Sequence, residues 1–221
     1  MRLLFDLDGT LTDPGSGITR CIQHALLGLN RIAPSSADLY WCVGPPLRES
    51  FATLLESSET ALLERAIALY RQRFASVGMF ENEVYPEIAD ALAELVADGH
   101  RLLVVTSKPH VYAEAILTHF KLRDMFVAVY GSELSGERCD KSILLRYMLS
   151  LEGDKEPSLM IGDRRHDIAA AHTSGLQSVG VLWGYGTYAE LEQAGARKIV
   201  ASVAELLEWI AVQQALAHAR P

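Results

Sequence analysis

Residues 3–11 read LLFDLDGTL, and this stretch decides the fold of the chain. Three apolar residues open it, and two aspartates separated by a leucine follow. Because side chains alternate along a strand, Asp6 and Asp8 are expected on the same side. Two carboxylates at the mouth of a buried strand repel each other, and a divalent cation or a shared proton relieves that repulsion. Gly9 then lets the backbone turn away sharply. The stretch therefore predicts a buried strand that ends in a polar site.

Four more apolar runs of strand length follow along the chain, at residues 102–105, 127–130, 159–161 and 179–183. Helical patterns separate them, at residues 88–96, 111–120, 141–151 and 167–174. Strands that read as continuous apolar runs and alternate with amphipathic helices are typical of a parallel sheet covered on both faces. The sequence therefore predicts an α/β fold with a Rossmann-like core.

One long stretch, residues 14–83, breaks this alternation because it holds helical patterns and no convincing strand. Apolar residues at helical spacing predict a small helical bundle there. In open α/β sheets the ligand crevice lies at the carboxyl ends of the strands, so an insertion after the first strand is expected to act as a lid. We therefore expect a core of residues 1–13 and 84–221 and an all-helical cap of residues 14–83.

The charge of the chain excludes one class of partner. Lys and Arg number 20 against 28 Asp and Glu, which gives a formal charge of −8, and the basic residues form no cluster. Such a chain repels a nucleic acid polymer. No segment approaches the apolar length of a membrane span, and the first apolar stretch is too short and too charged for a signal peptide. We expect a cytoplasmic protein that binds no membrane, as a monomer or homodimer.

Polar residues also follow the later predicted strands. Thr106 and Ser107 come directly after the second strand, where hydroxyls and the N–H groups of a helix start bind an oxyanion. Lys141 opens a helical pattern, and its ammonium suits phosphate. Asp163 and Asp167 follow the fourth strand. Oxygen-rich sites with open positions suit Mg²⁺, which takes the rest of its shell from water and substrate phosphate. The set therefore predicts a site for Mg²⁺ and phosphate.

These motifs resemble, in order and separation, the four motifs of the haloacid dehalogenase-like hydrolase superfamily, and the resemblance covers essentially the whole chain. The residues that match the four motifs are 6–11, Thr106, Lys141 and 162–167. The resemblance implies that Asp6 is the nucleophile that attacks phosphorus and forms an aspartyl-phosphate. It implies that Asp8 protonates the leaving alkoxide and then activates water as a base.

The same resemblance assigns the remaining site residues. Thr106, with Ser107 and Gly9, binds the phosphoryl group, and Lys141 holds both Asp6 and the phosphate. The carboxylates of Asp6 and Asp163 and the Asp8 carbonyl hold Mg²⁺, with Asp167 in support. Arg48, in the helical insertion, is a candidate for contacting a substrate phosphate or carboxylate, and an exposed role is the alternative.

Further stretches are similar to the phosphoglycolate-phosphatase-like branch with a helical C1-type cap: residues 43–51, 106–109, 130–134 and 180–186. Within it they look most like bacterial proteins labelled 5'-nucleotidase. Ser142 follows Lys141 where phosphoglycolate phosphatases usually carry proline, which favours the nucleotidase group. We therefore expect a phosphomonoesterase for a small soluble phosphate ester, with a nucleoside 5'-monophosphate first. Phosphoglycolate phosphatase, phosphomutase and a non-catalytic sensor stay open as alternatives.

Overall fold

The chain divides into two compact units. The computed structural model describes residues 1–153 and 156–218, so part of the expected core range 84–221 lies outside the described residues. Met1–Leu11 and Val84–Pro221 form the core unit, and Thr12–Glu83 form the inserted unit. The division falls after Leu11 and Glu83, against expected boundaries after residues 13 and 83.

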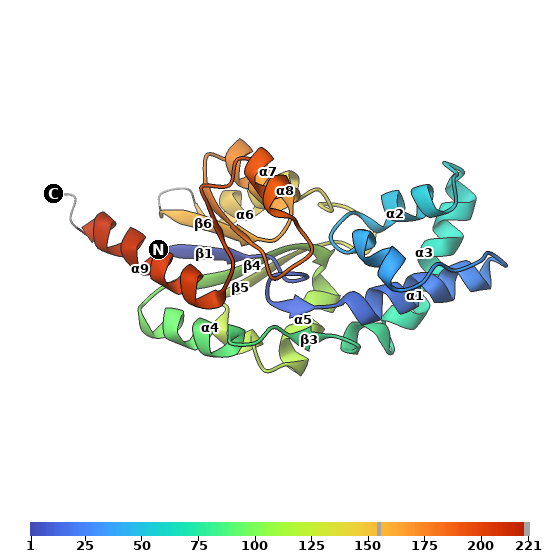
Figure 1. The fold of residues 1–221 in the computed structure, drawn as a ribbon, viewed down its shortest axis with the longest axis horizontal. Helices are drawn as coiled ribbons and strands as arrows, with labels where there is room; N and C mark the ends of the chain where they lie inside the picture. The colour runs from blue at the N-terminus through green and yellow to red at the C-terminus, as the bar shows by residue number, and fades with distance from the viewer. Residues whose placement is uncertain (154–155, 219–221) are drawn as a thin grey trace. The chain divides into compact units, whose positions relative to one another are not determined.

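The core unit is built on a six-stranded sheet in the order β5-β4-β1-β6-β7-β8 (Figure 1). Every neighbouring pair is parallel. The strands are β1 Arg2–Phe5, β4 Arg101–Pro109, β5 Ala128–Ser132, β6 Ser158–Gly162, β7 Gln177–Val181 and β8 Lys198–Val200. This confirms the predicted α/β class with a parallel Rossmann-like core.

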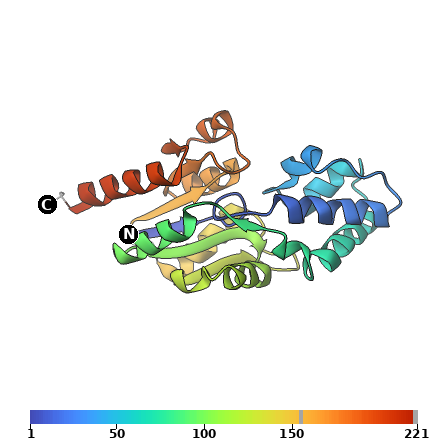
Figure 2. The same cartoon turned by 60° about the horizontal axis from the view of Figure 1, so that its bottom comes forward.

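Helices cover both faces of this sheet. They are α4 Ile88–Ala97, α5 His110–His119, α6 Lys141–Glu152, α7 Arg165–Thr173, α8 Tyr188–Gln193 and α9 Val203–His218, with a 3₁₀ turn η3 at Arg123–Met125. Figure 1 shows α6 and α7 on one side of the strands and α4 on the other, and in Figure 2 α4 comes to the front. One cluster of buried side chains joins the sheet to α6 and α7: Leu4, Leu103, Val105, Leu144, Leu145, Met148, Met160, Ala170 and Ala171. Burying these apolar surfaces is the main force that holds the layers together.

The position of β1 determines where a site can form. From β1 the chain moves outward to β4 and β5, and then returns across the sheet to β6, β7 and β8. The chain therefore extends the sheet first on one side of β1 and then on the other, and a crevice opens at the carboxyl end of β1, where this direction reverses. Asp6 and Asp8 follow β1 directly, so the fold brings them to that crevice.

The inserted unit is largely helical. It contains α1 Gly15–Gly28, the 3₁₀ helix η1 Ala37–Cys42, α2 Leu47–Leu54, α3 Thr60–Phe74 and the 3₁₀ turn η2 Gly78–Phe80. Its interior includes stacked rings of Tyr70 and Phe74, with centroids 5.3 Å apart, and the edge of Phe51 against Tyr70. Two short strands that were not predicted, β2 Thr12–Asp13 and β3 Glu83–Val84, pair at the two ends of the insertion.

Two features of the sheet differ from the sequence prediction. The edge strand β8 was not predicted, because three residues of which only Val200 is fully buried give no apolar run. Strand β4 was predicted to end at residue 105 but continues to Pro109, with an irregular register between Thr106 and Pro109. Thr106 therefore lies within the strand rather than after it.

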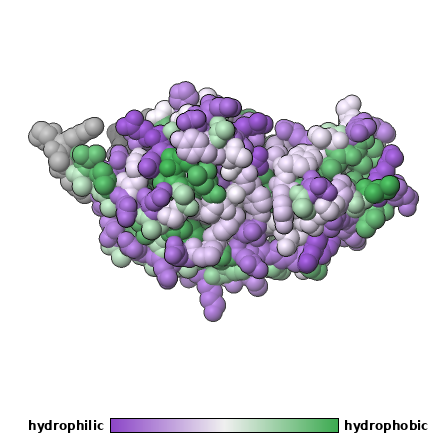
Figure 3. Space-filling view, in the orientation of Figure 1, coloured by the Kyte–Doolittle hydropathy of each residue, from purple (hydrophilic) through white to green (hydrophobic). Residues whose placement is uncertain are grey.

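One face of the molecule is predominantly polar. On the face drawn in Figure 3, hydrophilic residues cover most of the area and hydrophobic residues form small separate groups. Among residues 1–153 and 156–218, no helix combines the length and apolar character needed to cross a bilayer.

Candidate active site

A buried lysine contacts two of the other predicted site residues. Lys141 Nζ lies 2.9 Å from Asp6 Oδ1 and 2.8 Å from Asp167 Oδ1. It also donates a hydrogen bond of 2.9 Å to the carbonyl of Val105. All four residues are buried. A buried ammonium is tolerated only when charges and hydrogen bonds replace its water shell, and here three oxygens do so.

Lys141 stays positively charged in this setting. Burial alone would lower its pKa, but the carboxylates of Asp167 and Asp6 outweigh burial and raise it above the ordinary value. Lys141 is the first residue of α6, and the side chain of Asp140 caps this helix by accepting a 3.0 Å hydrogen bond from Ile143 N–H. This hydrogen bond fixes the start of α6, and with it the point from which the Lys141 side chain enters the site.

A second ion pair holds Asp8. Lys108 Nζ, from β4, lies 2.6 Å from Asp8 Oδ2. Burial raises the pKa of Asp8, and the nearby Lys108 offsets this only in part. The other oxygen, Oδ1, is buried and has no hydrogen-bond partner among the described residues. The Asp8 carboxyl is therefore anchored through one oxygen only.

Lys108 was not among the site residues predicted from the sequence. The signal was present: Lys108 follows Thr106 by two positions, and alternation along a strand sends both side chains to the same side. It went unused because the prediction ended the strand at residue 105. Thr10 and Tyr185, described next, were missed for a different reason, since they meet Asp163 only through the fold.

Three carboxylates converge next to Lys141. One oxygen from each of Asp6, Asp163 and Asp167 lies within 4.8 Å of the other two. Asp163 is fully buried and accepts hydrogen bonds from the N–H of Tyr185 at 2.8 Å and from Thr10 Oγ1 at 3.4 Å. Burial raises the pKa of Asp163 well above its ordinary value, and the charges of Asp167 and Asp6 add to this shift.

Both oxygens of Asp167 are engaged, one by a lysine and one by a backbone N–H. Oδ1 faces Lys141, and Oδ2 accepts a 3.1 Å hydrogen bond from the N–H of Arg164. Burial raises the pKa of Asp167 to about 6, although Lys141 opposes the shift. Asp167 was expected to support the metal site, which stays a prediction. In the structure its contact orients Lys141.

The donor set fits a hard divalent cation. When all are ionised, the carboxylates of Asp6, Asp163 and Asp167 outnumber the Lys141 ammonium by two negative charges. That imbalance, in a buried cluster of closely spaced carboxylate oxygens, matches one bound dication. Oxygen ligands of this kind suit Mg²⁺ better than metals that prefer nitrogen or sulfur.

Glycines allow the backbone to close around Asp163. A Cβ on Gly9 would lie 2.2 Å from Asp163 Oδ2, and the φ of Gly9 is +81°, where only glycine is unstrained. A Cβ on Gly184 would lie 2.2 Å from the Gly9 carbonyl oxygen. The sequence analysis assigned Gly9 to substrate binding, which stays a prediction. The structure adds a packing role against Asp163.

The two hydroxyl residues lie at the end of β4. Thr106 is buried, and its hydroxyl accepts a 3.3 Å hydrogen bond from the N–H of Lys108. Ser107 is half-buried, and its carbonyl accepts a 2.8 Å hydrogen bond from Ser132 Oγ. Their roles in binding phosphate stay predictions.

Arg48 belongs to the inserted unit and not to the acid cluster of the core unit. It lies on α2 and forms an exposed ion pair with Glu64 on α3. Its contact with substrate stays a prediction. Trp183 lies in the core unit, where its indole Nε1 donates a 3.0 Å hydrogen bond to the carbonyl of Thr10.

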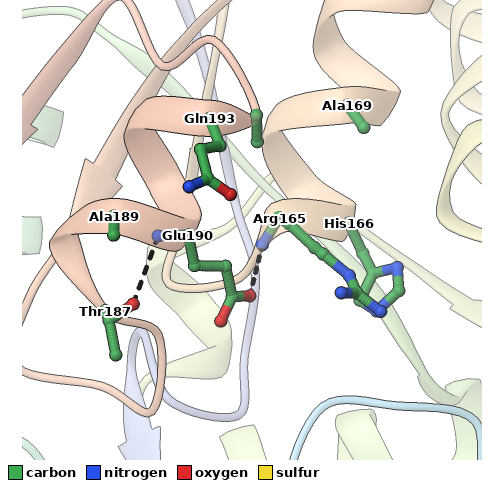
Figure 4. Close-up of a pocket in the computed structure, with 8 residues that line it drawn as sticks. Arg165, His166, Ala169, Thr187, Ala189, Glu190 and Gln193 are labelled. Carbon is green, nitrogen blue, oxygen red and sulfur yellow. Dashed lines mark hydrogen bonds between the residues drawn. The ribbon is translucent and has the colours of Figure 1, made fainter.

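A hollow of about 570 Å³ lies between α7 and α8 (Figure 4). Figure 4 shows Glu190 accepting a hydrogen bond from the N–H of Arg165, at 2.9 Å, and its own N–H bound to Thr187. Glu190 also pairs with Arg164 at 3.0 Å. None of the residues that line this hollow belongs to the acid and lysine cluster. The polar groups of this hollow form hydrogen bonds between the N-terminal ends of α7 and α8.

Comparison with known proteins agrees with this geometry. The family model described as haloacid dehalogenase-like hydrolase matches residues 3–181. The chain belongs to the haloacid dehalogenase-like hydrolase family. This confirms the family predicted from the sequence motifs and identifies the chain as a hydrolase.

Three proteins of similar sequence or structure show which kinds of protein this hydrolase resembles. A Pseudomonas aeruginosa protein named 5'-nucleotidase is 46% identical over 191 residues, which are 86% of each chain. The crystal structure of a predicted phosphatase from Clostridium acetobutylicum has a TM-score of 0.90 at 42% identity, over 95% of this chain and 97% of that one. A Mycobacterium tuberculosis protein named tyrosine-protein kinase PtkA is 34% identical over 213 residues, 95% of this chain and 72% of its own.

Proposed function

We propose that this hydrolase is a Mg²⁺-dependent phosphomonoesterase that forms an aspartyl-phosphate on Asp6. The observation that carries the proposal is the position of Lys141, whose ammonium contacts Asp6 and Asp167 beside the cluster of three carboxylates. Phosphoryl transfer depends mainly on positioning and on neutralising charge. A fixed ammonium and a cation-binding acid cluster next to a nucleophilic carboxylate supply both.

In the first half-reaction an Asp6 carboxylate oxygen attacks phosphorus. The bond between phosphorus and the ester oxygen breaks, and Asp8 gives its proton to that leaving oxygen. Burial raises the pKa of Asp8, which favours the protonated form that this step requires. Lys141 stabilises the charge of the attacking carboxylate and of the phosphoryl oxygens.

In the second half-reaction water attacks the phosphorus of the aspartyl-phosphate. Asp8, now ionised, takes a proton from that water, and the bond from phosphorus to the Asp6 oxygen breaks. Inorganic phosphate leaves and both carboxyl groups return to their starting states. The same residue thus serves as acid and then as base.

The other residues bind and orient. Thr106, Ser107 and Gly9 hold the phosphoryl group, and Asp167 holds Lys141. Asp6, Asp163 and the Asp8 carbonyl would hold the Mg²⁺, which when bound neutralises charge on the phosphoryl oxygens. The inserted unit acts as a cap that excludes bulk water, a role supported by its place in the chain directly after β1.

The substrate we propose is a nucleoside 5'-monophosphate in the cytoplasm. The name of the Pseudomonas aeruginosa relative and the serine at position 142 support this choice. Phosphoglycolate is the second candidate. The relative named tyrosine-protein kinase raises a third possibility, transfer of a phosphoryl group to a protein tyrosine.

The experiment is a phosphate-release assay with a panel of adenosine and guanosine monophosphates, phosphoglycolate and sugar phosphates, each with Mg²⁺ and with EDTA. We expect release with Mg²⁺, none with EDTA, and a fall in kcat of at least about a thousandfold in Asp6→Asn. Asp124→Asn, on an exposed turn, is the control and keeps full activity.

Several outcomes would contradict the proposal. Full activity in Asp6→Asn or in EDTA would contradict the mechanism. Two parallel assays test the alternatives. Interconversion of sugar phosphates without phosphate release, followed by chromatography, would identify a phosphomutase. Labelling of an added tyrosine peptide from ATP, without hydrolysis, would identify a kinase. No turnover of any substrate would favour a sensor.

A further inference from the structure

The ion pair between Lys108 and Asp8 has no part in the mechanism described above. The ammonium lies 2.6 Å from Asp8 Oδ2, and the two side chains are 5% and 13% exposed. Removing both charges from water costs much of what their attraction returns, so such a pair is a weak source of stability. Its position on the proposed acid points to a role in the reaction.

The two oxygens of Asp8 have different surroundings. Oδ2 faces the ammonium, whereas Oδ1 is buried without a hydrogen-bond partner among the described residues. A buried polar atom that makes no hydrogen bond is costly and calls for an explanation. Oδ1 is the oxygen that remains available to a reacting group.

We propose that Lys108 is a positioning residue that fixes the Asp8 carboxyl through Oδ2, so that Oδ1 exchanges the proton with the substrate. The inference rests on the proposed phosphatase function. The ammonium disfavours a proton on Oδ2, because an O–H donor there would face the N–H donors of Lys108. The proton of the acid therefore sits on Oδ1, the oxygen without a partner.

The proton balance follows from this assignment. In the first half-reaction the bond to the ester oxygen breaks, its electron pair stays on that oxygen, and the oxygen takes the proton of Oδ1. In the second, water bonds to phosphorus and gives one proton to Oδ1 while the bond from phosphorus to Asp6 breaks. Lys108 keeps its three protons throughout and contributes only orientation.

The test compares two esters that differ in their need for an acid. An alkyl phosphate, such as AMP or the best alkyl ester of the panel, requires protonation of its leaving oxygen. The p-nitrophenolate of p-nitrophenyl phosphate leaves without it. We expect Lys108→Met to lower kcat/KM, which reports the first half-reaction, about a hundredfold for the alkyl ester and less than about tenfold for p-nitrophenyl phosphate. Hydrolysis of the aspartyl-phosphate is common to both esters, so kcat falls for both. Lys108→Arg, which keeps the charge, restores part of the loss.

Two further variants separate positioning from general damage. Lys198→Met, on the exposed edge strand β8, is the control and changes neither rate. In an Asp8→Asn background, Lys108→Met has no further effect on the alkyl ester if it acts only through Asp8.

Equal losses of kcat/KM on both esters, or additive losses in the double variant, would overturn the positioning role. A lysine variant as active as wild type would do the same. A wild-type protein that hydrolyses neither ester would overturn the proposed function itself, and the inference with it. The wild-type rates thus report on the function, and the ratio between esters reports on Lys108.

Discussion

At the scale of single residues, the missing side chain of Gly9 determines the shape of the site. Its φ of +81° turns the chain away after Asp8, and the space where a Cβ would lie is occupied by the Asp163 carboxylate. Gly99 provides a natural comparison, because its φ is +80° but, apart from its chain neighbours, no atom of the described residues lies within 4 Å of a Cβ built there. The two positions share the backbone strain and differ in crowding.

Gly9→Ala is therefore expected to be much more harmful than Gly99→Ala. The strain of a left-handed alanine costs about 1 kcal/mol at either position. At Gly9 the added methyl group also displaces Asp163, so phosphatase activity and Mg²⁺ affinity fall sharply. Urea denaturation gives the free energies of unfolding, and calorimetric Mg²⁺ titration measures the second effect. Equal stability and equal activity of the two variants would contradict the packing role of Gly9.

Single residues also show where sequence reasoning succeeded and where it stopped. Asp6, Lys141 and Asp163 stand at the ends of recognisable strands or at a helix start, so their convergence was predictable from periodicity and family motifs. Lys108 was missed because the end of β4 was predicted four residues too early, at residue 105 instead of Pro109. Tyr185 contributes its backbone N–H to Asp163, and no side-chain pattern encodes that contact.

At the scale of elements, one carboxylate connects three parts of the inserted unit. Glu81 follows the turn η2, and its oxygens contact Arg73 on α3 at 2.6 Å and Arg20 on α1 at 2.8 Å. The Glu81 carbonyl also accepts a 2.9 Å hydrogen bond from the N–H of Gly17. Hydrogen bonds from Arg73 lower the pKa of Glu81, burial opposes this shift, and Arg20 adds to the lowering.

The direction of this shift predicts how stability depends on pH. Because the pKa of Glu81 is lower in the folded state, its ion pairs stabilise the fold above the ordinary glutamate pKa of about 4.3. That stability is lost as the pH falls through the lowered pKa. We expect Glu81→Gln to cost about 1 kcal/mol of unfolding free energy at pH 7 and progressively less at acid pH.

Urea denaturation of the wild type and the variant at several pH values measures this difference. Glu83→Gln, an exposed glutamate in the same unit, is the control and shows no such trend. A Glu81→Gln difference that stays constant from neutral to acid pH would show that the charge of Glu81 does not act through these ion pairs.

The elements themselves were predictable to different degrees. Long apolar runs and amphipathic helices were found within a few residues, because burial imposes a clear period on the sequence. The strand β8 was missed because three residues carry too little pattern, and its strand character comes from pairing with β7. Strand β4 was predicted too short, since Thr106 and Ser107 are polar and the apolar rule ends a strand where polar residues begin.

At the scale of the whole molecule, the order of the strands brings residues that are far apart in the sequence into one site. Asp6, Lys141 and Asp163 are far apart along the chain, and they meet because β1 lies between β4 and β6. The sequence alone predicted a parallel sheet but not this order. Periodicity placed polar residues at the ends of strands but left open which of them come together. The family resemblance predicted that Asp6, Lys141 and Asp163 do.

The central claim is that Asp6 becomes phosphorylated during turnover. The most direct measurement mixes the Asp8→Asn variant with Mg²⁺ and p-nitrophenyl phosphate, quenches the mixture in acid, and maps the phosphoryl group by peptide mass spectrometry. This variant lacks the base for the second half-reaction, and the substrate does not need an acid for the first, so the intermediate accumulates. We predict a phosphoryl group on Asp6, which is absent when Asp6→Asn is added. A phosphoryl group on another residue, or turnover without any label on Asp6, would contradict the account.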